Sequence, residues 1–522
     1  VLLTFIITTI IAGAVGSLSF GRLDSGGYSD LNSDSAKAAK YVVDVFGAEE
    51  PVAVMVVDSA SSTVNDPAVA STATEIEKKI QDHKGVSKTY SYWSTGGSPT
   101  MKSKDGKAGF ILVYSDLDAF DWDALGSLGA SLQEEFDGKY KNVHIYASGA
   151  GVITYAINHK IEKDLILAES IAIPLTFLLL VFVFGALVAS ATPLFVGVTA
   201  ILGSFFIIYL LTLFTNVSVF ALNLITGLGL GLGIDYALLM VNRFREELHN
   251  GHSVEESVVT TVATAGKTVF YSGLTVFVTM ASLLFFPLEF LKSFGYAGVA
   301  VITFAVIGAA IALPALLAVL GEKVDKGVVR KSAITPKEDG RWAHTARNVM
   351  QRPVPVVLAC LVVLGILAAP VTNISFAQVD SRVLPASNPA AIAADVVDTR
   401  FDGLIGSPIE VVVPNGVGRE SEINSFLDKV KKVDGIVRVG AIEVYGQDIR
   451  VQVISSVPSR STDSLQVIHD IRNLDQPVGT LIGGAAADFT DSQDGIAKTL
   501  PLALGWIALT VLILIFIFTG SI

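Results

Sequence analysis

The sequence predicts a polytopic α-helical membrane protein with two external α+β domains. Of its 522 residues, 51% are hydrophobic and only 16% are charged. Eight apolar runs approach the ~20 residues that an α-helix needs to cross a bilayer. Two long polar segments interrupt these runs, one after the first run and one after the seventh. Length and composition together argue against a soluble single-domain protein.

Spanning helices are predicted from the length of each apolar run. They cover Val1–Gly16, Leu165–Val188, Pro193–Phe214, Phe220–Val241, Thr268–Phe286, Phe294–Leu320, Val354–Thr372 and Leu500–Thr519. The chain opens inside the first run without a Met, so we expect a partial first spanning helix rather than a signal peptide. The expected division is 1–19 partial first helix, 20–160 first external domain, 161–320 five-helix bundle, 321–352 cytoplasmic loop, 353–373 seventh helix, 374–497 second external domain and 498–522 eighth helix.

Lys and Arg in the short loops predict the orientation, because such loops stay in the cytoplasm. Arg243, Arg245 and Lys267 follow the fourth helix. The loop after the sixth helix carries Lys323, Lys326, Arg330, Lys331, Lys337, Arg341, Arg347 and Arg352. Both polar segments are therefore expected outside a plasma membrane that the chain crosses several times. This basic loop also suits anionic lipid, although topology alone explains it. The net charge of −12 argues against nucleic acid as a partner.

Each polar segment alternates strands and helices in the ferredoxin-like order β-α-β-β-α-β. The first is expected to have strands Pro51–Val57, Ser87–Trp93, Gly109–Tyr114 and Val143–Ala147, and helices Pro67–His83 and Ala124–Phe136. The second is expected to have strands Pro408–Val413, Ile436–Ile442, Asp448–Ile454 and Val478–Ile482, and helices Glu420–Val433 and Ser464–Leu474. Small-residue turns before the second and eighth helices also match, as do the Phe46-Gly47 and Phe401-Asp402-Gly403 segments. The sequence therefore predicts two parallel repeats, the second of them truncated.

The fourth predicted helix contains a single ionisable side chain, Asp235. A carboxyl near the middle of a spanning helix costs ~2.5–3.5 kcal/mol, so it is retained where it pairs or carries protons. We expect Asp235 to be buried between helices and to load and release protons, with the Tyr236 hydroxyl beside it. Alternate glycines (Gly227, Gly229, Gly231 and Gly233) leave two sides of this helix open to close approach by neighbours. The alternative is that Asp235 only joins helices through hydrogen bonds.

The fifth predicted helix carries a polar stripe. Ser272, Thr275 and Thr279 fall at positions i, i+3 and i+7 of an otherwise apolar helix. We expect this stripe to face Asp235 and, together with Asn242 on the same face as Asp235, to line a water path. The alternative is that the hydroxyls donate to carbonyls of their own preceding turn.

No set of side chains indicates catalysis, a metal or an organic cofactor. The seven histidines are scattered and no nucleotide-binding loop is apparent, so protons are the expected coupling ion and an enzyme is the least expected class. Aromatic residues of the external domains suit either an apolar cleft or ordinary cores; they are Tyr28, Tyr90, Tyr92, Trp93, Phe110, Trp122 and Phe401.

Several motifs resemble those of the MmpL transporters of the RND superfamily. Residues 233–239 (GIDYALL) and 243–247 (RFREE) resemble the signature of the fourth helix, and residues 26–30, 266–272 and 286–292 fit as well. The likeness covers essentially the whole chain and is strongest to exporters or flippases of trehalose monomycolate in mycobacteria and corynebacteria. It implies the RND fold, with twelve spanning helices and two porter domains. It also implies that Asp235 and Tyr236 meet a second Asp-Tyr pair in a tenth helix, which this sequence does not reach, and that Ser272 lines the proton channel.

We therefore expect a secondary transporter that uses the proton motive force to export or flip a cell-envelope lipid, foremost trehalose monomycolate. Asp235, Tyr236 and Ser272 would carry protons, and Asn242, Thr275 and Thr279 would line the water path. The glycolipid would enter a cleft between the porter domains, whose contact residues the sequence does not identify. Membrane lipids and envelope accessory proteins are further candidate partners. The alternatives are RND-type efflux of drugs or other lipids, and a non-transporting, lipid-binding membrane scaffold.

Overall fold

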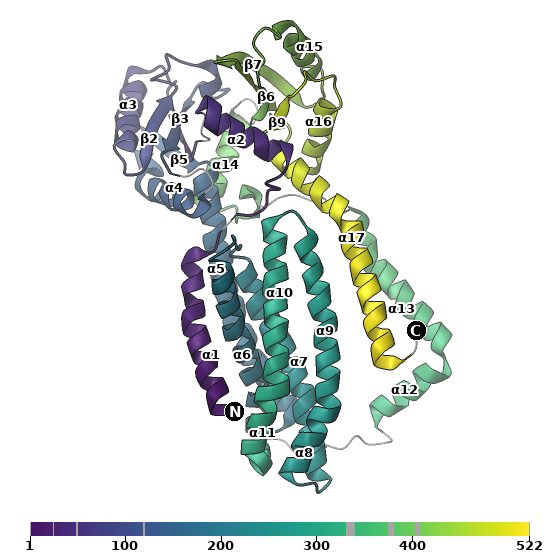
Figure 1. Ribbon diagram of the computed structural model, residues 1–522. Coiled ribbons are helices and arrows are strands. Elements are labelled where there is room, and N and C mark those ends of the chain that lie inside the picture. The colour runs from purple at the N-terminus through teal and green to yellow at the C-terminus, as the bar shows by residue number, and fades with distance from the viewer. Residues whose placement is uncertain are drawn as a thin grey trace.

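The computed structural model describes residues 2–24, 26–47, 51–117, 121–329, 340–373, 380–401 and 408–520. Two α+β lobes lie at one end of a set of long helices (Figure 1). Eight helical segments among the described residues are long and apolar enough to cross a membrane. Six residues of the sequence predictions lie outside the described ranges, namely Val1, Arg330, Lys331, Lys337, Asp402 and Gly403.

Every predicted spanning helix is present. The long helices are α1 (Leu2–Gly16), α5 (Ala150–Phe184), α6 (Leu187–Leu211), α7 (Ala221–His249), α9 (Lys267–Ala281), α10 (Glu289–Ile307), α13 (Pro353–Ala368) and α17 (Ala485–Thr519). A π-helical segment, Val262–Gly266, joins the short helix α8 (Val254–Thr261) to α9, and another, Gly308–Ala312, joins α10 to α11 (Leu313–Leu320). Small and branched side chains such as Ala200, Val241 and Ala305 form the core of the bundle.

Two of these helices are longer than their apolar runs. Both α5 and α17 have 35 residues and continue without a break from a lobe into the spanning region. Each begins after a glycine with positive φ, +107° at Gly149 and +89° at Gly484, and each ends at a left-handed glycine. The predicted starts at Leu165 and Leu500 were wrong because hydropathy marks only the apolar part of a helix.

The first lobe is a five-stranded antiparallel sheet in the order β2-β3-β1-β5-β4. Its strands are β1 (Ala53–Asp58), β2 (Val86–Ser91), β3 (Ala108–Ser115), β4 (Gly138–Tyr140) and β5 (Val143–Ser148), and its helices are α3 (Pro67–Gln81) and α4 (Trp122–Phe136). Met55 in the central strand lies opposite Ile111 and Ala147 and is fully buried. The short strand β4 was not predicted.

The second lobe is a four-stranded antiparallel sheet in the order β7-β8-β6-β9. Its strands are β6 (Ile409–Val413), β7 (Ile436–Tyr445), β8 (Asp448–Ser455) and β9 (Leu481–Gly483), and its helices are α15 (Glu420–Val430) and α16 (Thr462–Arg472). The strand predicted to begin at Val478 begins at Leu481. A turn precedes it, in which Thr480 N–H donates to the Pro477 carbonyl at 3.1 Å and Gly479 has φ +83°.

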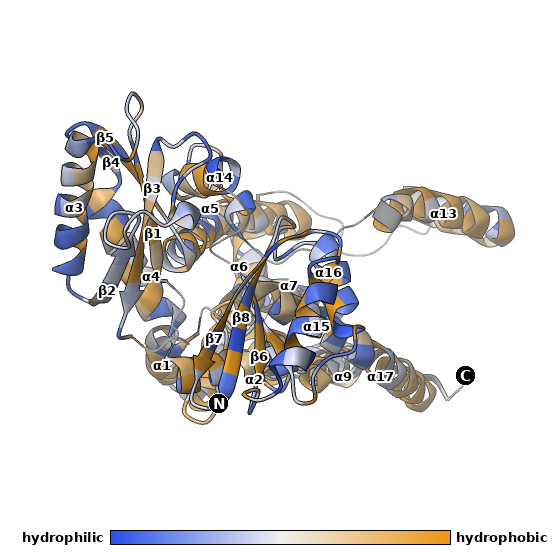
Figure 2. Ribbon diagram, turned by 90° about the horizontal axis from the view of Figure 1, so that it is seen from above, coloured by the Kyte–Doolittle hydropathy of each residue, from blue (hydrophilic) through white to orange (hydrophobic). Residues whose placement is uncertain are grey.

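The two lobes exchange helices. Helix α2 (Asp34–Phe46) precedes the first lobe but packs on β9 of the second, and α14 (Pro389–Arg400) precedes the second lobe but packs on β5 of the first (Figures 1 and 2). The Phe401 ring that follows α14 stacks on Phe110 of β3, with ring centroids 3.8 Å apart. Neither helix was among the predicted elements.

An arginine fastens α14 to the first lobe. The Arg400 guanidinium lies 2.8 Å from an Asp58 carboxylate oxygen and 2.9 Å from one of Asp105. Burial raises the pKa of Asp105, but hydrogen bonds from the Ser103 hydroxyl, the Lys107 N–H and Arg400 outweigh it and bring that pKa down to about 2.

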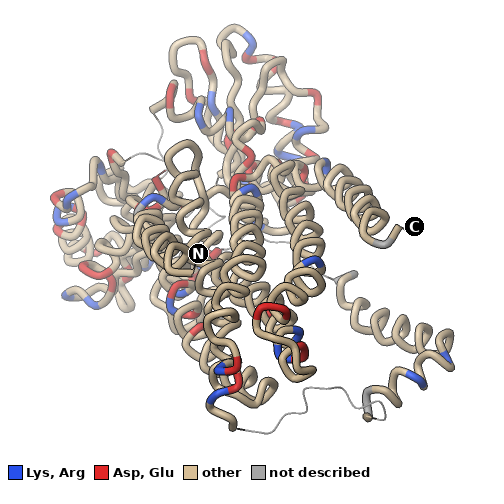
Figure 3. Tube along the Cα trace, turned by 60° about the horizontal axis from the view of Figure 1, so that its bottom comes forward, with Lys and Arg blue, Asp and Glu red and all other residues tan. Residues whose placement is uncertain are grey.

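Charged residues concentrate in the lobes and at the opposite end of the bundle (Figure 3). At that opposite end, the residues predicted as loop 321–352 contain a further helix, α12 (Arg341–Gln351). The sequence analysis did not predict this helix within the loop, and the cytoplasmic position of the loop stays a prediction.

Candidate functional site

Helix α7 carries Asp235, and only one of its two glycine faces packs closely against α6. A Cβ added at Gly233 would lie 2.5 Å from the Gly197 Cα of α6, and one at Gly229 would lie 2.8 Å from Ile201. These two glycines therefore permit the helix contact, as expected for small residues in membranes. Gly227 and Gly231 have no atom within 4 Å of such a Cβ. The predicted close approach is confirmed for one of the two glycine faces.

The other face of α7 is uncovered by the described part of the chain. Gly227, Gly231, Asp235, Leu239 and Asn242 follow one another at spacings of three or four residues, and all five are exposed. The expected burial of Asp235 was therefore wrong for this structure, since no described helix lies over its face. This stripe places a carboxyl, an amide, two glycines and Leu239 on the uncovered face of α7.

Tyr236 points the other way, into the bundle. Its side chain is 5% exposed, and its hydroxyl is buried without a hydrogen-bond partner among the described residues. A Cβ added at Gly273 of α9 would lie 3.6 Å from that hydroxyl, and Ser272 directly precedes Gly273 on the same helix. Tyr236 therefore lies against α9 near Ser272, and the expectation that the Ser272 stripe faces Asp235 stays a prediction.

The threonines of the α9 stripe follow the alternative interpretation. Thr275 donates to the Tyr271 carbonyl and Thr279 to the Thr275 carbonyl, both at 2.9 Å. Their hydroxyls are therefore satisfied by their own helix. Ser272 is exposed, and so is Asn242 on α7. Among the residues of the predicted water path, Asn242 and Ser272 are exposed and can meet solvent or a partner helix. The hydroxyls of Thr275 and Thr279 already donate to carbonyls of α9.

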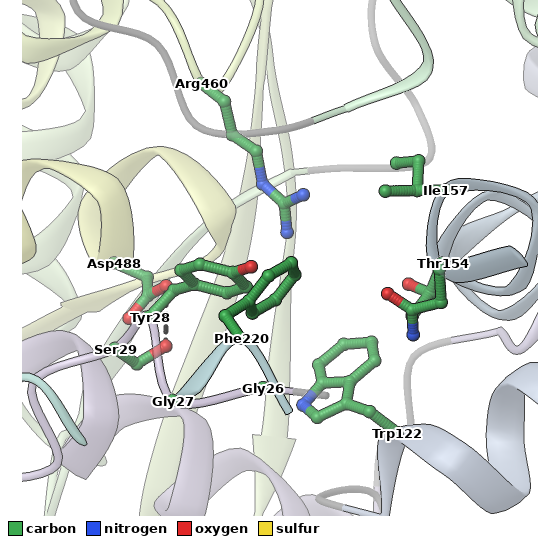
Figure 4. Close-up of a pocket in the computed structure, with 11 residues that line it drawn as sticks. Gly26, Gly27, Tyr28, Ser29, Trp122, Thr154, Ile157, Phe220, Arg460 and Asp488 are labelled. Carbon is green, nitrogen blue, oxygen red and sulfur yellow. Dashed lines mark hydrogen bonds between the residues drawn. The ribbon is translucent and has the colours of Figure 1, made fainter. Parts of the chain in front are cut away.

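A second candidate site lies where the lobes meet the bundle (Figure 4). It is a cavity of about 110 Å³ whose walls come from the 26–29 segment, α4, α5, the start of α7, the loop before α16 and the start of α17. Its lining residues are Gly26, Gly27, Tyr28, Ser29, Trp122, Thr154, Ile157, Asn158, Phe220, Arg460 and Asp488. We call it the neck cavity. It is smaller than the ~300–1,000 Å³ of drug-sized ligand pockets, so in this conformation it suits part of a ligand.

Hydrogen bonds hold the walls of the neck cavity together. The Ser29 hydroxyl donates to the Asp488 carboxylate at 2.9 Å, and Ser492, one turn further along α17, donates to the Tyr28 carbonyl at 2.8 Å. The Tyr28 ring packs against Phe220 and Phe290, with centroids 5.8 and 5.2 Å away. Burial raises the pKa of Tyr28, while Arg460 opposes that rise, so the phenol is a neutral donor at physiological pH.

The neck cavity combines aromatic faces with polar groups that can hydrogen-bond a sugar or another polar headgroup. Trp122, Tyr28 and Phe220 supply the faces, and Arg460 supplies a guanidinium group (Figure 4). Asn158 on α5 adds an amide to the lining. Sequence reasoning named Tyr28 and Trp122 as candidates but missed the other three. No sequence signal linked these three residues to the cavity, because they lie far from the 26–29 segment along the chain.

Other predicted aromatic residues belong to the lobe itself. Tyr92 donates to the Asn65 side chain at 2.9 Å, and the Trp93 indole donates to the Val64 carbonyl at 2.9 Å. These contacts match the alternative of an ordinary lobe interior rather than a cleft. Within the described ranges, no three His, Cys, Asp or Glu side chains gather in a way that would hold a metal ion.

Eight potential spanning helices, two lobes at one end of them and a carboxyl inside one spanning helix define a multi-pass membrane protein of the transporter class. The chain belongs to the MMPL family, whose model matches residues 28–356.

Curated relatives agree with this assignment. A putative membrane protein of Streptomyces coelicolor is 32% identical over 97% of this chain and 70% of its own length. The trehalose monomycolate exporter MmpL3 of Mycobacterium tuberculosis is 27% identical over 98% of this chain and 59% of its own length. The mycolic acid-containing lipids exporter MmpL11 of Mycolicibacterium smegmatis is 27% identical over 76% of this chain and 43% of its own length. The chain thus spans well under two thirds of either exporter.

Proposed function

We propose that this chain carries out proton-motive-force-driven export or flipping of a cell-envelope lipid, with trehalose monomycolate as the foremost cargo. It would act as a secondary transporter in the plasma membrane, with both lobes on the extracytoplasmic side. The observation that carries the proposal is a carboxyl, Asp235, in a spanning helix of a chain that belongs to a transporter family. The named activities of MmpL3 and MmpL11 support a lipid cargo.

The proton role rests on the energetics of Asp235. An acid facing hydrocarbon in a spanning helix costs ~2.5–3.5 kcal/mol, so the exposed stripe of α7 is expected to meet water or a polar partner in the working transporter. The family resemblance supplies such a partner, a second Asp-Tyr pair on a tenth helix. In this proposal, proton exchange at Asp235 changes the packing of α7, and Tyr236 passes that change to α9 through Ser272.

The lobes are proposed to be ferredoxin-like porter domains related as parallel repeats. Two features support this. Apart from the additional strand β4 in the first lobe, the two lobes have the same order of strands and helices, and each leads into a 35-residue helix through a glycine with positive φ. Their extracytoplasmic position is supported by three basic residues at the end away from the lobes, namely Arg243 near the C-terminal end of α7, Lys267 at the start of α9 and Lys323 after α11.

The cargo headgroup is proposed to pass through the neck cavity, where Trp122 and Tyr28 offer faces for a sugar ring. The cavity joins both lobes to α5, α7 and α17, so a change in the bundle would alter its shape.

Reconstitution of the protein in proteoliposomes tests the proposal. With an imposed pH gradient, we expect movement of trehalose monomycolate and proton flux in the wild type, loss of both in Asp235→Asn, and partial recovery in Asp235→Glu. Asp44→Asn removes an exposed carboxyl from α2 and serves as the matched control. Undiminished transport by Asp235→Asn, with correct membrane insertion, would refute the proton role.

Two alternatives give different results in the same assay. Efflux of drugs or other lipids predicts proton flux that responds to those compounds and not to trehalose monomycolate. A lipid-binding scaffold predicts lipid retention without flux in any variant. Mass spectrometry of the lipid that co-purifies with the wild type distinguishes the cargo classes.

A further inference from the structure

A second carboxyl lies inside a potential spanning helix and has no part in the transport cycle proposed above. Glu169 belongs to α5, which runs from Ala150 to Phe184. It lies ~6 Å beyond Leu165, where the apolar run begins on the side of the lobes, at 1.5 Å per residue. Because a carboxyl at this depth is unfavourable without a partner, such a residue indicates a functional site.

The Glu169 carboxyl lacks a hydrogen-bond partner for one of its oxygens within the described part of the chain. Its Oε1 atom is buried and unpaired there, although the residue as a whole is half-buried. Pro174 has no N–H, so the neighbouring Ser170 carbonyl also lacks its usual helical donor one turn further along. Glu169 Oε1 and the Ser170 carbonyl are therefore both suited to accept a hydrogen bond from a ligand.

The fold itself does not require this carboxyl. Helix α17 has the same length as α5, 35 residues, and likewise begins after a glycine with positive φ. The position that corresponds to Glu169, counted from the start of each helix, is occupied in α17 by Leu504, which is exposed. A spanning helix of this plan thus forms with an ordinary apolar side chain there. The difference between the two helices indicates a ligand of α5 rather than a need of folding.

Glu169 shares one face of α5 with polar residues that lead to the neck cavity. Thr154, Asn158, Glu162, Glu169 and Thr176 fall within an arc of about 80° at 3.6 residues per turn. Thr154 and Asn158 line the neck cavity, and Glu169 lies ~16 Å further along the helix than Asn158. Farther from the lobes the same face is closed, because Leu180 is buried in the core of the bundle.

The composition of this face identifies the kind of ligand. It offers carboxyl, amide and hydroxyl groups, and it carries no Lys or Arg, since Lys160 and Lys163 fall outside the arc. A headgroup with a phosphate would find no cation on this face and would be repelled by Glu162 and Glu169. The hydroxyls of a sugar, in contrast, are neutral donors, and the two oxygens of a carboxylate can accept from adjacent hydroxyls.

We propose that Glu169 is a subsite for the sugar headgroup of a lipid in the leaflet nearest the lobes, where its carboxylate accepts hydrogen bonds from the headgroup hydroxyls. The headgroup would be held there before it reaches Asn158 and Thr154 at the neck cavity. The subsite rests on the proposed function for its lipid cargo, but Glu169 acts by binding and has no share in the proton exchange at Asp235.

Binding of a sugar lipid to the full chain, without a pH gradient, tests the subsite. Native mass spectrometry in a sugar-free detergent measures the binding of trehalose monopalmitate and, separately, of phosphatidylethanolamine. We expect Glu169→Gln to bind the sugar lipid at least about fivefold more weakly than the wild type, because a charged acceptor is replaced by a neutral one. Asp164→Asn removes an exposed carboxyl about 140° round the same helix and should bind as the wild type does. Unchanged binding of the sugar lipid by Glu169→Gln, or a loss limited to phosphatidylethanolamine, would overturn the proposal.

A measurement on the wild type does not depend on how well the variant folds. Trehalose monopalmitate with a diazirine on its sugar is irradiated with the full chain in nanodiscs, and the labelled peptides are identified by mass spectrometry. We expect label on α5 between Leu165 and Ile173, with Glu169 as the main site, and displacement of that label by excess unmodified trehalose monopalmitate. Label confined to other helices, or label at Glu169 that the unmodified lipid does not displace, means that no sugar subsite exists there.

The subsite and the transport function fail in different ways. If Glu169→Gln binds the sugar lipid normally while Asp235→Asn abolishes flux, the subsite is wrong and the transport proposal stands. If the wild type binds the sugar lipid through Glu169 but moves no lipid under a pH gradient, the transport proposal is wrong and the subsite stands.

Discussion

The close contact between α6 and α7 can be tested by a matched pair of substitutions in the same helix. Gly233→Ala places a methyl group against α6, and Gly231→Ala places the same group on the uncovered face two residues away. A Cβ at position 233 would lie 2.5 Å from the Gly197 Cα and 2.7 Å from its N, whereas a Cβ at position 231 would meet nothing within 4 Å.

The magnitude follows from these distances. Ordinary Cβ contacts lie at 3.4–4 Å, and both atoms in the way at position 233 belong to the backbone, so no side-chain rotation relieves the clash. We therefore take the upper end of the overpacking range, ~3 kcal/mol. Alanine also gains ~1 kcal/mol over glycine in helix propensity at either position. The net expectation is a loss of ~2 kcal/mol for Gly233→Ala and a gain of ~1 kcal/mol for Gly231→Ala.

The assay is equilibrium unfolding of the full chain in mixed micelles, with increasing SDS, followed by tryptophan fluorescence. The two variants should differ by ~3 kcal/mol in the free energy of unfolding, on either side of the wild type. If Gly233→Ala is as stable as Gly231→Ala, the contact between α6 and α7 does not have the geometry described here, and the assignment of Asp235 to the open face fails with it.

Asp325→Asn should lower stability by about 3 kcal/mol in the same titration, because it removes the partner, 2.7 Å away, of the buried Arg245. Glu322→Gln, on an exposed neighbouring carboxyl, should have no effect. Arg400→Gln should loosen α14 from the first lobe, which hydrogen exchange of β5 would detect. The loss of stability caused by Arg400→Gln should also depend on pH. The depressed pKa of Asp105 stabilises the native contact above the unfolded value of ~3.9, and that contribution is lost as the pH falls through about 2. The difference between wild type and Arg400→Gln should therefore be constant from neutral pH down to about 5 and shrink below about 4, whereas a constant difference at all pH values would contradict the role of Asp105.

The spanning helices were predictable because hydropathy is a local property. The starts of α5 and α17 were not, since polar stretches, Asn158–Asp164 in α5 and Thr490–Thr499 in α17, separate the first turns from the apolar runs. Helices α2 and α14 were missed for a related reason. Each covers a sheet formed by a different part of the chain, and no local signal indicates which surface a helix will find.

At the candidate site, the sequence singled out Tyr236 and Ser272 as candidates, because both lie on apolar helices where a polar group stands out, but it did not indicate that Tyr236 lies against α9. It was wrong about the burial of Asp235, which depends on what covers the exposed stripe of α7. The sequence also left open the roles of Thr275 and Thr279. In the structure both hydroxyls donate to backbone carbonyls of their own preceding turns. The neck cavity could not be predicted, because Trp122, Phe220 and Asp488 converge only after both lobes have docked on the bundle.

The exchanged helices have a consequence for biosynthesis. Strand β5 ends at Ser148, but α14, which packs on it, begins at Pro389. A ribosome therefore completes the first sheet long before it has translated the helix that shields it, and six potential spanning segments lie in between. During that interval the apolar surface around Phe110 and Ala147 is open to aggregation, so this half of the nascent protein requires protection until Phe401 has emerged.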